Sequence, residues 1–143
     1  MRRSINTAHI SEIVGKYSEA AARLALMANG WTVHTAETDE PYDILATDPL
    51  TGEHKRIQVK TIRQRNDRGG ELVVYAKKGN GEPYGKSDAD YIIGVWCEEG
   101  EIPRVYMFEC RGIGEYWMSA ARASERWVEL PITLNRAIHT EIA

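Results

Sequence analysis

The sequence predicts an α/β (α+β) fold in which helices flank a mixed central β-sheet. Three observations support this class: a long helical repeat of apolar residues near the N-terminus, a series of short β-type segments after it, and a return to helical patterns near the C-terminus. With 143 residues, 43% of them hydrophobic, the chain is long enough for one compact domain, and no Pro-, Ser- or Gly-rich linker divides it. We therefore expect a single domain over residues 1–143.

The expected elements follow from periodicity and turn chemistry. Apolar residues keep helical spacing over 10–28, and Asn29-Gly30 provides a left-handed stop. Residues 48–52 form the clearest turn between β-type segments, and helices are predicted again at 115–124 and from Leu134 to the end. The segments rich in Gly and basic residues, 63–70 and 77–86, are predicted to be exposed loops. The predicted strands are 31–36, 42–47, 55–62, 72–76, 91–97 and 104–109.

Composition excludes several classes of protein. The N-terminus lacks the apolar core of a signal peptide, and no apolar run is long enough to cross a bilayer, so we expect no membrane partner and a cytoplasmic location, which is the host cytoplasm for a phage-encoded protein. Cys97 and Cys110 lie in apolar segments and are expected to be reduced packing residues, while the four histidines lack zinc-ligand spacing.

Charge is distributed unevenly along the chain. The formal net charge of -3 argues against a protein that coats nucleic acid non-specifically. Residues 54–86, however, hold nine Lys/Arg and only three Asp/Glu. This segment is either a local phosphate-binding surface or an ordinary solvated strand and loop, and charge alone does not separate the two interpretations.

Two neighbouring strands carry the candidate chemistry. Asp43 begins an apolar strand, where burying a carboxylate without a partner is costly. In the following strand Gln58 and Lys60 share one face, because strand side chains alternate with a period of two. A hairpin turn centred between Leu50 and Thr51 would place Asp43 opposite Gln58, with Cβ atoms about 5 Å apart, close enough for two oxygens to hold one cation.

These residues carry a resemblance to a known family. Glu19 within segment 15–19, Asp43 within 41–44 and Gln58-Val59-Lys60 within 57–61 resemble the PD-(D/E)XK nuclease superfamily, and in particular the archaeal-type Holliday junction resolvases, with similar small proteins in phages. Segment 88–93 also resembles the family's entry into its next core strand. Gln58 departs from the commonest pattern, which has an acid there, although some homing endonucleases of this superfamily also carry Gln-x-Lys.

The resemblance implies a restriction-endonuclease-like core and a site that uses Mg²⁺, with Mn²⁺ able to substitute. Asp43 is then the central metal ligand, Gln58 and the Val59 carbonyl are supporting ligands, and Glu19 binds a metal or its water. Lys60 would orient the attacking water and stabilise developing negative charge.

Each assignment has a plainer alternative. Asp43 on its own fits a strand-entry cap, and Gln58 and Lys60 fit an exposed sheet face. Glu19 fits a solvated helix face, and Glu12 competes with it for the catalytic role. The candidate DNA contacts, each alone more typical of an ordinary surface residue, are Lys16, Arg23, Thr38, Arg63, Arg65, Arg68, Lys77, Lys78 and Lys86.

The function expected from sequence is that of a structure-selective Holliday junction resolvase, because the chain has no room for a separate sequence-reading domain. The alternatives are a sequence-specific homing or restriction-type endonuclease and a non-catalytic DNA-binding module. Paired incision of a junction predicts a homodimer. Candidates for its interface, which fit a hydrophobic core equally well, are Tyr116, Trp117, Met118, Trp127 and Val128.

Overall fold

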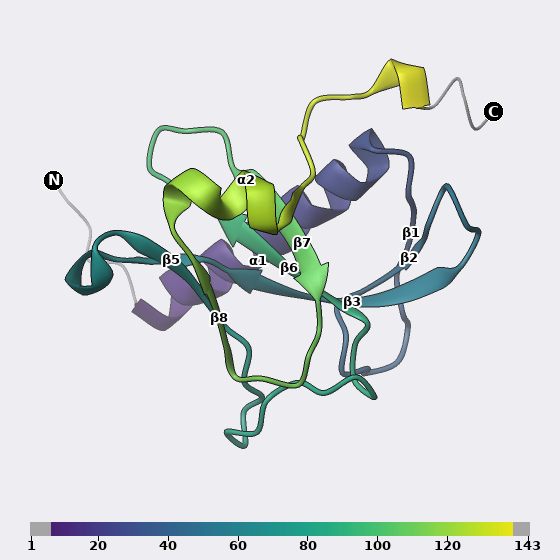
Figure 1. The fold of residues 1–143 in the computed structure, drawn as a ribbon. Coiled ribbons are helices and arrows are strands. Elements are labelled where there is room, and N and C mark those ends of the chain that lie inside the picture. The colour runs from purple at the N-terminus through teal and green to yellow at the C-terminus, as the bar shows by residue number, and fades with distance from the viewer. Residues whose placement is uncertain (1–6, 139–143) are drawn as a thin grey trace, which may run out of the picture.

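A computed structural model describes residues 7–138 as one long helix and nine strands in two sheets (Figure 1). The main sheet has the order β1-β2-β3-β6-β7-β9, and the smaller sheet has the order β4-β5-β8. The helical elements are α1 (Thr7–Ala28), η1 (Asn66–Arg68), η2 (Ala120–Arg122) and α2 (Ala123–Arg126). The main-sheet strands are β1 (Thr32–His34), β2 (Ile44–Thr47), β3 (His54–Thr61), β6 (Tyr91–Trp96), β7 (Arg104–Glu109) and β9 (Val128–Glu129). The remaining strands are β4 (Arg63–Arg65), β5 (Glu71–Tyr75) and β8 (Glu115–Met118).

The main sheet separates two hydrophobic cores. On one face, α1 packs over a cluster that includes Ile57 and Val59 of β3. On the other face, the smaller sheet and the segment around α2 cover a second cluster, which includes Ile92 and Tyr106 (Figure 1). This arrangement confirms the predicted mixed sheet flanked by helices, because β3 and β6 pair in parallel while the other neighbours are antiparallel.

The hairpin of β2 and β3 has the register expected from its turn. Ile44 pairs with Ile57 and Leu45 with Arg56, as a turn centred between residues 50 and 51 requires. Gly52 closes the turn with a φ of 76°, a conformation that glycine adopts without steric cost. Asp43 departs from this register, which would place it opposite Gln58. Its N–H donates instead to the carbonyl of Ile57 at 2.9 Å, and the strand ladder begins only at Ile44.

The central parallel pair brings β6 close to the second core. A Cβ at Gly94 would lie 2.9 Å from side-chain carbons of both Ile62 and Val74, closer than real side chains pack. Glycine at this position therefore allows the smaller sheet to approach the main sheet next to β3.

Several predicted elements differ from the structure. The helix expected at 115–124 is wrong, because β8 pairs with β5 and places Tyr116 in the second core, so that only the short η2 and α2 follow it. The loop expected at 63–70 contains β4 and η1, since β4 forms a hairpin with β5. Residues 136–138 are helical, and the rest of the predicted last helix lies outside the described residues.

The two cysteines and the candidate interface residues differ in how deeply they are buried. Cys97 and Cys110 are free, and Cys110 is buried as a packing residue. Trp127 is also buried in the second core, whereas Trp117 and Val128 are exposed. No helix within residues 7–138 has the length and apolar character required to cross a bilayer.

Candidate active site

The backbone of β3 holds Asp43 in place from two sides. The Asp43 N–H donates to the Ile57 carbonyl, and its Oδ2 accepts a 2.9 Å hydrogen bond from the N–H of Val59. Both anchors lie on the residues that flank Gln58. The carboxylate is therefore fixed beside the predicted Gln58-Val59-Lys60 motif, although Asp43 itself stands outside the strand ladder.

The Asp43 carboxylate lies in an environment that disfavours its charge. Burial raises the pKa of Asp43, the Val59 N–H lowers it, and the neighbouring carboxylate of Glu19 raises it again. The positive charges of Lys60 and Lys16 lower the pKa more weakly. A cation next to Asp43 and Glu19 would offset both the burial and the repulsion between the two acids.

Gln58 presents an amide without a protein partner. Its side chain is only 7% exposed, yet it makes no hydrogen bond with any of residues 7–138. Both amide atoms of Gln58 keep some exposure to solvent, since neither is both fully buried and without a partner. Buried polar groups are normally hydrogen-bonded, so an accessible and unpartnered amide is available to a ligand.

Lys60 lies against the ring of Tyr84, a residue that the sequence did not single out. The Lys60 Nζ is 5.1 Å from the centroid of the Tyr84 ring, a cation–π distance, and Lys60 forms no ion pair with the described acids. Burial, and then the charge of Asp43, raises the pKa of Tyr84. Tyr84 therefore lies beside Lys60, within the electrostatic range of Asp43.

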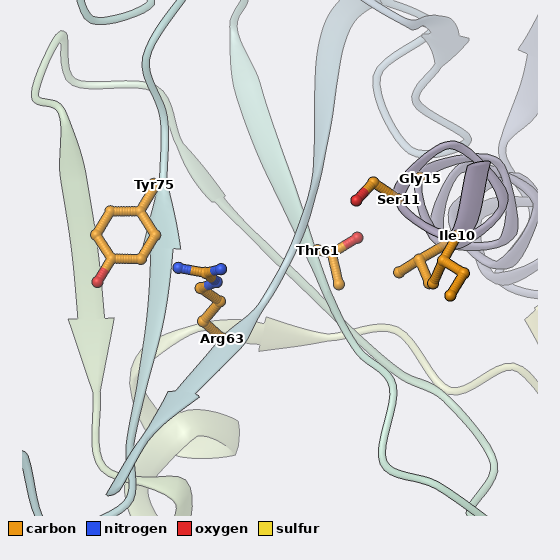
Figure 2. A pocket seen from close by; sticks show the side chains of 7 residues that line it. Ile10, Ser11, Gly15, Thr61, Arg63 and Tyr75 are labelled. Atoms are coloured by element: carbon orange, nitrogen blue, oxygen red, sulfur yellow. The ribbon is translucent and has the colours of Figure 1, made fainter. Parts of the chain in front are cut away.

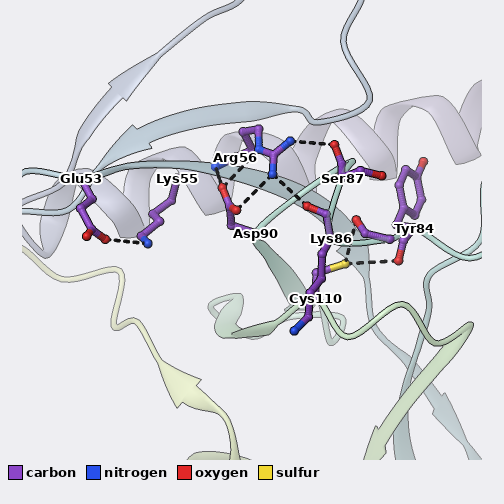
Figure 3. Close-up of polar contacts among 9 residues, drawn as sticks. Glu53, Lys55, Arg56, Tyr84, Lys86, Ser87, Asp90 and Cys110 are labelled. Carbon is purple, nitrogen blue, oxygen red and sulfur yellow. Dashed lines mark hydrogen bonds and ion pairs between the residues drawn. The ribbon is translucent and has the colours of Figure 1, made fainter.

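Arg56 anchors the segment that carries Tyr84 (Figure 3). From β3, its guanidinium donates to the carbonyls of Ser87 at 2.7 Å and Lys86 at 2.9 Å, and it pairs with Asp90. The thiol of Cys110 also lies 3.3 Å from the Tyr84 carbonyl. The Arg56 contacts tie the connection between β5 and β6 to the strand that carries Gln58 and Lys60, and the Cys110 contact ties it to the end of β7.

Arg23 links α1 to the site. Its Nη2 donates to Glu19 Oε1 and to the Asp43 carbonyl, each at 3.1 Å. Arg23, a predicted DNA contact, therefore positions Glu19 next to Asp43 and is already engaged in the protein. Glu12, the alternative acid on the same helix, is exposed.

The structure divides the other predicted DNA contacts into two groups. One group is already occupied: Arg65 pairs with Asp67, Lys78 pairs with Asp88, and the hydroxyl of Thr38 donates to Glu40. Arg68 pairs with Glu71 and with Glu115 in the same way. The other group forms no ion pair with the described residues and consists of Lys16, Arg63, Lys77 and Lys86.

A cleft of about 560 Å³ begins one residue beyond Lys60. It lies between the N-terminal half of α1, the end of β3 and the small sheet, and it is lined by Ser11, Thr61, Arg63 and Tyr75 among others (Figure 2). Figure 2 shows the Arg63 side chain between Tyr75 and Thr61. An unpaired guanidinium in a cleft beside the site suits a phosphate group.

The donor set fits magnesium. Within residues 7–138 no three His, Cys, Asp or Glu side chains gather around one point, so an all-protein cage is absent there. Mg²⁺ characteristically uses one or two carboxylates and keeps several waters. Asp43 and Glu19 supply two such carboxylates, and the free amide of Gln58 adds a neutral oxygen.

Comparison with known proteins identifies the fold. No model of a protein family matches this chain, and no curated protein matches it significantly. Two chains of solved structures match. One is the bacterial homing endonuclease I-Ssp6803I, at 20% sequence identity, with a TM-score of 0.61 and coverage of 92% of both chains. The chain therefore shares the fold of a known endonuclease.

Proposed function

We propose that the chain is a metal-dependent endodeoxyribonuclease with a site formed by Glu19, Asp43, Gln58 and Lys60. One observation supports the proposal: a desolvated carboxylate fixed to β3, a free amide and an unpaired lysine belong to one hairpin. Burying such groups without binding partners lowers stability, and perturbed carboxylates of this kind cluster at functional sites.

The chemistry follows from the donors. Bound Mg²⁺, or Mn²⁺ in its place, would supply an activated water and neutralise charge on the phosphate. Asp43 and Glu19 would hold the ion, with the Gln58 amide and the Val59 carbonyl as supporting ligands. Lys60 donates from its ammonium to the attacking water or to the phosphate oxygens, while the Tyr84 ring restricts the positions open to it.

The fold comparison favours intact duplex DNA as the substrate, cut at a preferred sequence. The neighbour described as a homing endonuclease covers 92% of each chain, and Gln-x-Lys occurs among homing endonucleases of the PD-(D/E)XK superfamily. Arg63 and Lys16 are unpaired near the site and are the residues best placed to contact the DNA backbone.

A Holliday junction resolvase is the second candidate. The resemblance of segments 15–19, 41–44 and 57–61 to the archaeal-type resolvases supports it, as does the small size of the chain. A non-catalytic module is disfavoured, because retaining Asp43 and Lys60 would then lower stability without a compensating role.

Cleavage assays test the proposal directly. Labelled four-way junctions, matched linear duplexes and a plasmid library are incubated with the protein in Mg²⁺ or in EDTA. We expect Mg²⁺-dependent cleavage that falls by about 1,000-fold in Asp43→Asn and Lys60→Ala. Lys55→Ala is the control, since Lys55 lies on the same strand but pairs with Glu53.

The outcomes separate the candidates. Cleavage of duplex at a preferred sequence supports the homing-type function, and cleavage of junctions alone supports a resolvase. Equal activity in EDTA, full activity in Lys60→Ala, or DNA binding with no cleavage in either metal would contradict the nuclease proposal.

A further inference from the structure

On α1 most of the small apolar residues are buried and most of the large ones are exposed, which is the reverse of the usual pattern on a surface helix. The buried residues on the face that contacts the sheet are mostly small, namely Ser18, Ala21, Ala22, Ala25, Leu26 and Ala28. The large apolar residues are 43–52% exposed, namely Ile10, Ile13, Tyr17, Leu24 and Met27, and Ile10 also lines one edge of the cleft. A helix that is apolar on both sides is typical of one buried between two partners.

The exposed residues follow a heptad pattern. From Ile10 to Met27, steps of three and four alternate through Ile13, Tyr17, Ala20 and Leu24, and Ala20 is also exposed. We call these six residues the outer stripe. A period of 3.5 residues keeps a stripe facing a second helix along its whole length. The outer stripe therefore matches another helix better than a flat sheet or a bilayer.

We propose that the outer stripe packs against the outer stripe of a second copy of this chain, forming a twofold-symmetric dimer. An identical helix supplies the same heptad spacing, which makes the contact self-complementary, as a twofold interface requires. Among the described residues nothing covers the stripe. The inference stands on the surface of the helix alone and is independent of the nuclease chemistry.

The exposed area is sufficient for a specific contact. At roughly 200 Å² for each fully exposed large side chain, the five large residues together with Val14 expose about 500 Å² of side-chain surface on each chain. Two such surfaces bury about 1,000 Å², the lower limit of specific interfaces. A patch of about 500 Å² is as large as the largest apolar patches of typical soluble monomers, which are often functional.

The candidate catalytic side chains stay outside the contact in this dimer, and Ile10 of the outer stripe lines one edge of the cleft near them. Glu19 and Arg23 lie on a different flank of α1, where they contact Asp43 and its surroundings. A twofold axis would then relate the two sites, just as a twofold axis relates the antiparallel strands of a DNA duplex.

Sedimentation velocity from 1 to 100 µM tests the interface. The wild-type chain is expected to be a dimer, and the double variant Ile13→Glu, Leu24→Glu a monomer, with dimerisation weakened on the order of 100-fold or more, because carboxylates enter an apolar contact. Leu50→Glu is the matched control, since Leu50 is 79% exposed in a turn away from α1, and it should remain dimeric. Circular dichroism should be unchanged, because both stripe residues are about half exposed, and the melting temperature of the variant should no longer depend on protein concentration, because association no longer stabilises the fold.

A cysteine cross-link gives a second readout. Ala20 lies near the middle of the outer stripe, so Ala20→Cys should form a disulfide-linked dimer under mild oxidation, whereas the wild-type chain should not. A wild-type monomer at 100 µM overturns the proposal and leaves the stripe to another segment of the chain or to a different protein. A dimer that survives both glutamates, or an Ala20→Cys variant that fails to cross-link, also overturns it.

Discussion

Replacing Gln58 by methionine is expected to stabilise the metal-free protein and to weaken its cleavage of DNA. Methionine has nearly the same shape as glutamine, so the change removes the amide without opening a cavity. The Gln58 side chain is 7% exposed and has no hydrogen-bond partner among the described residues, but its amide atoms are not completely enclosed. The stability gain should therefore be about 1 kcal/mol, below the cost of a completely enclosed amide.

Urea unfolding in EDTA, followed by tryptophan fluorescence, measures this gain. With a slope of about 2 kcal/mol per molar urea, the midpoint should rise by about 0.5 M. Cleavage in Mg²⁺ should fall roughly 10- to 100-fold, because a supporting ligand is lost. Gln64→Met is the control: Gln64 is exposed, and its amide donates to the Gly70 carbonyl. A lower midpoint for Gln58→Met in EDTA would show that the amide is already satisfied and that its role is structural.

Three further predictions concern charges around the site. The folded pKa of Asp43 is raised above 3.8, mainly by burial, so its ionisation lowers stability as pH rises through that pKa. In EDTA, Asp43→Asn should therefore be more stable than wild type at pH 7, and the difference should disappear below pH 3.8. Arg63→Ala should reduce by about one the slope of the logarithm of the DNA-binding constant against the logarithm of the salt concentration. Arg65→Ala should change this slope less, because Arg65 pairs with Asp67. Arg56→Ala should lower unfolding free energy by about 2 kcal/mol, and Arg56→Lys should recover less than half, since lysine cannot reproduce the fork of donors.

Each of these measurements has an outcome that contradicts the reasoning. Urea midpoints that favour wild type over Asp43→Asn at pH 7 would mean that the carboxylate is stabilised by contacts and not destabilised by burial. Equal salt slopes for the Arg63 and Arg65 variants would remove the distinction between paired and unpaired arginines. An Arg56→Ala variant as stable as wild type would show that the connection before β6 does not depend on this anchor.

The sequence predicted the hairpin of β2 and β3 well, because the information that specifies it is local. A tight turn and two short strands set the register, which the structure confirms from Ile44 opposite Ile57 onward. Asp43 deviates from that register. Its carboxylate accepts a hydrogen bond from the Val59 N–H, a backbone group that would otherwise be free to pair with the neighbouring strand. Alternation along a strand carries no information about such a side-chain to backbone bond.

Non-local contacts account for what the sequence did not predict. Tyr84 lies in a Gly-rich segment that is typical of a loop, and non-local contacts place it near Lys60: Arg56 donates to the carbonyls of residues 86 and 87, and the Tyr84 N–H donates to the Ala76 carbonyl. Residues 115–124 favour a helix locally, but pairing with β5 makes the first four a strand. The ion pairs of Arg65 and Arg68 likewise depend on how β4 folds back on β5.

The position of the three candidate site residues on a single hairpin has a consequence for folding and evolution. Asp43, Gln58 and Lys60 lie within 18 residues of one another, so their arrangement requires the closure of only one short loop. The parallel pairing of Ile57 with Tyr91 closes a much longer loop and is expected to form later. Substitutions in the second core should therefore alter folding rate and thermal tolerance while leaving the hairpin geometry intact, which would allow the outer parts of the chain to diverge faster than the candidate metal ligands.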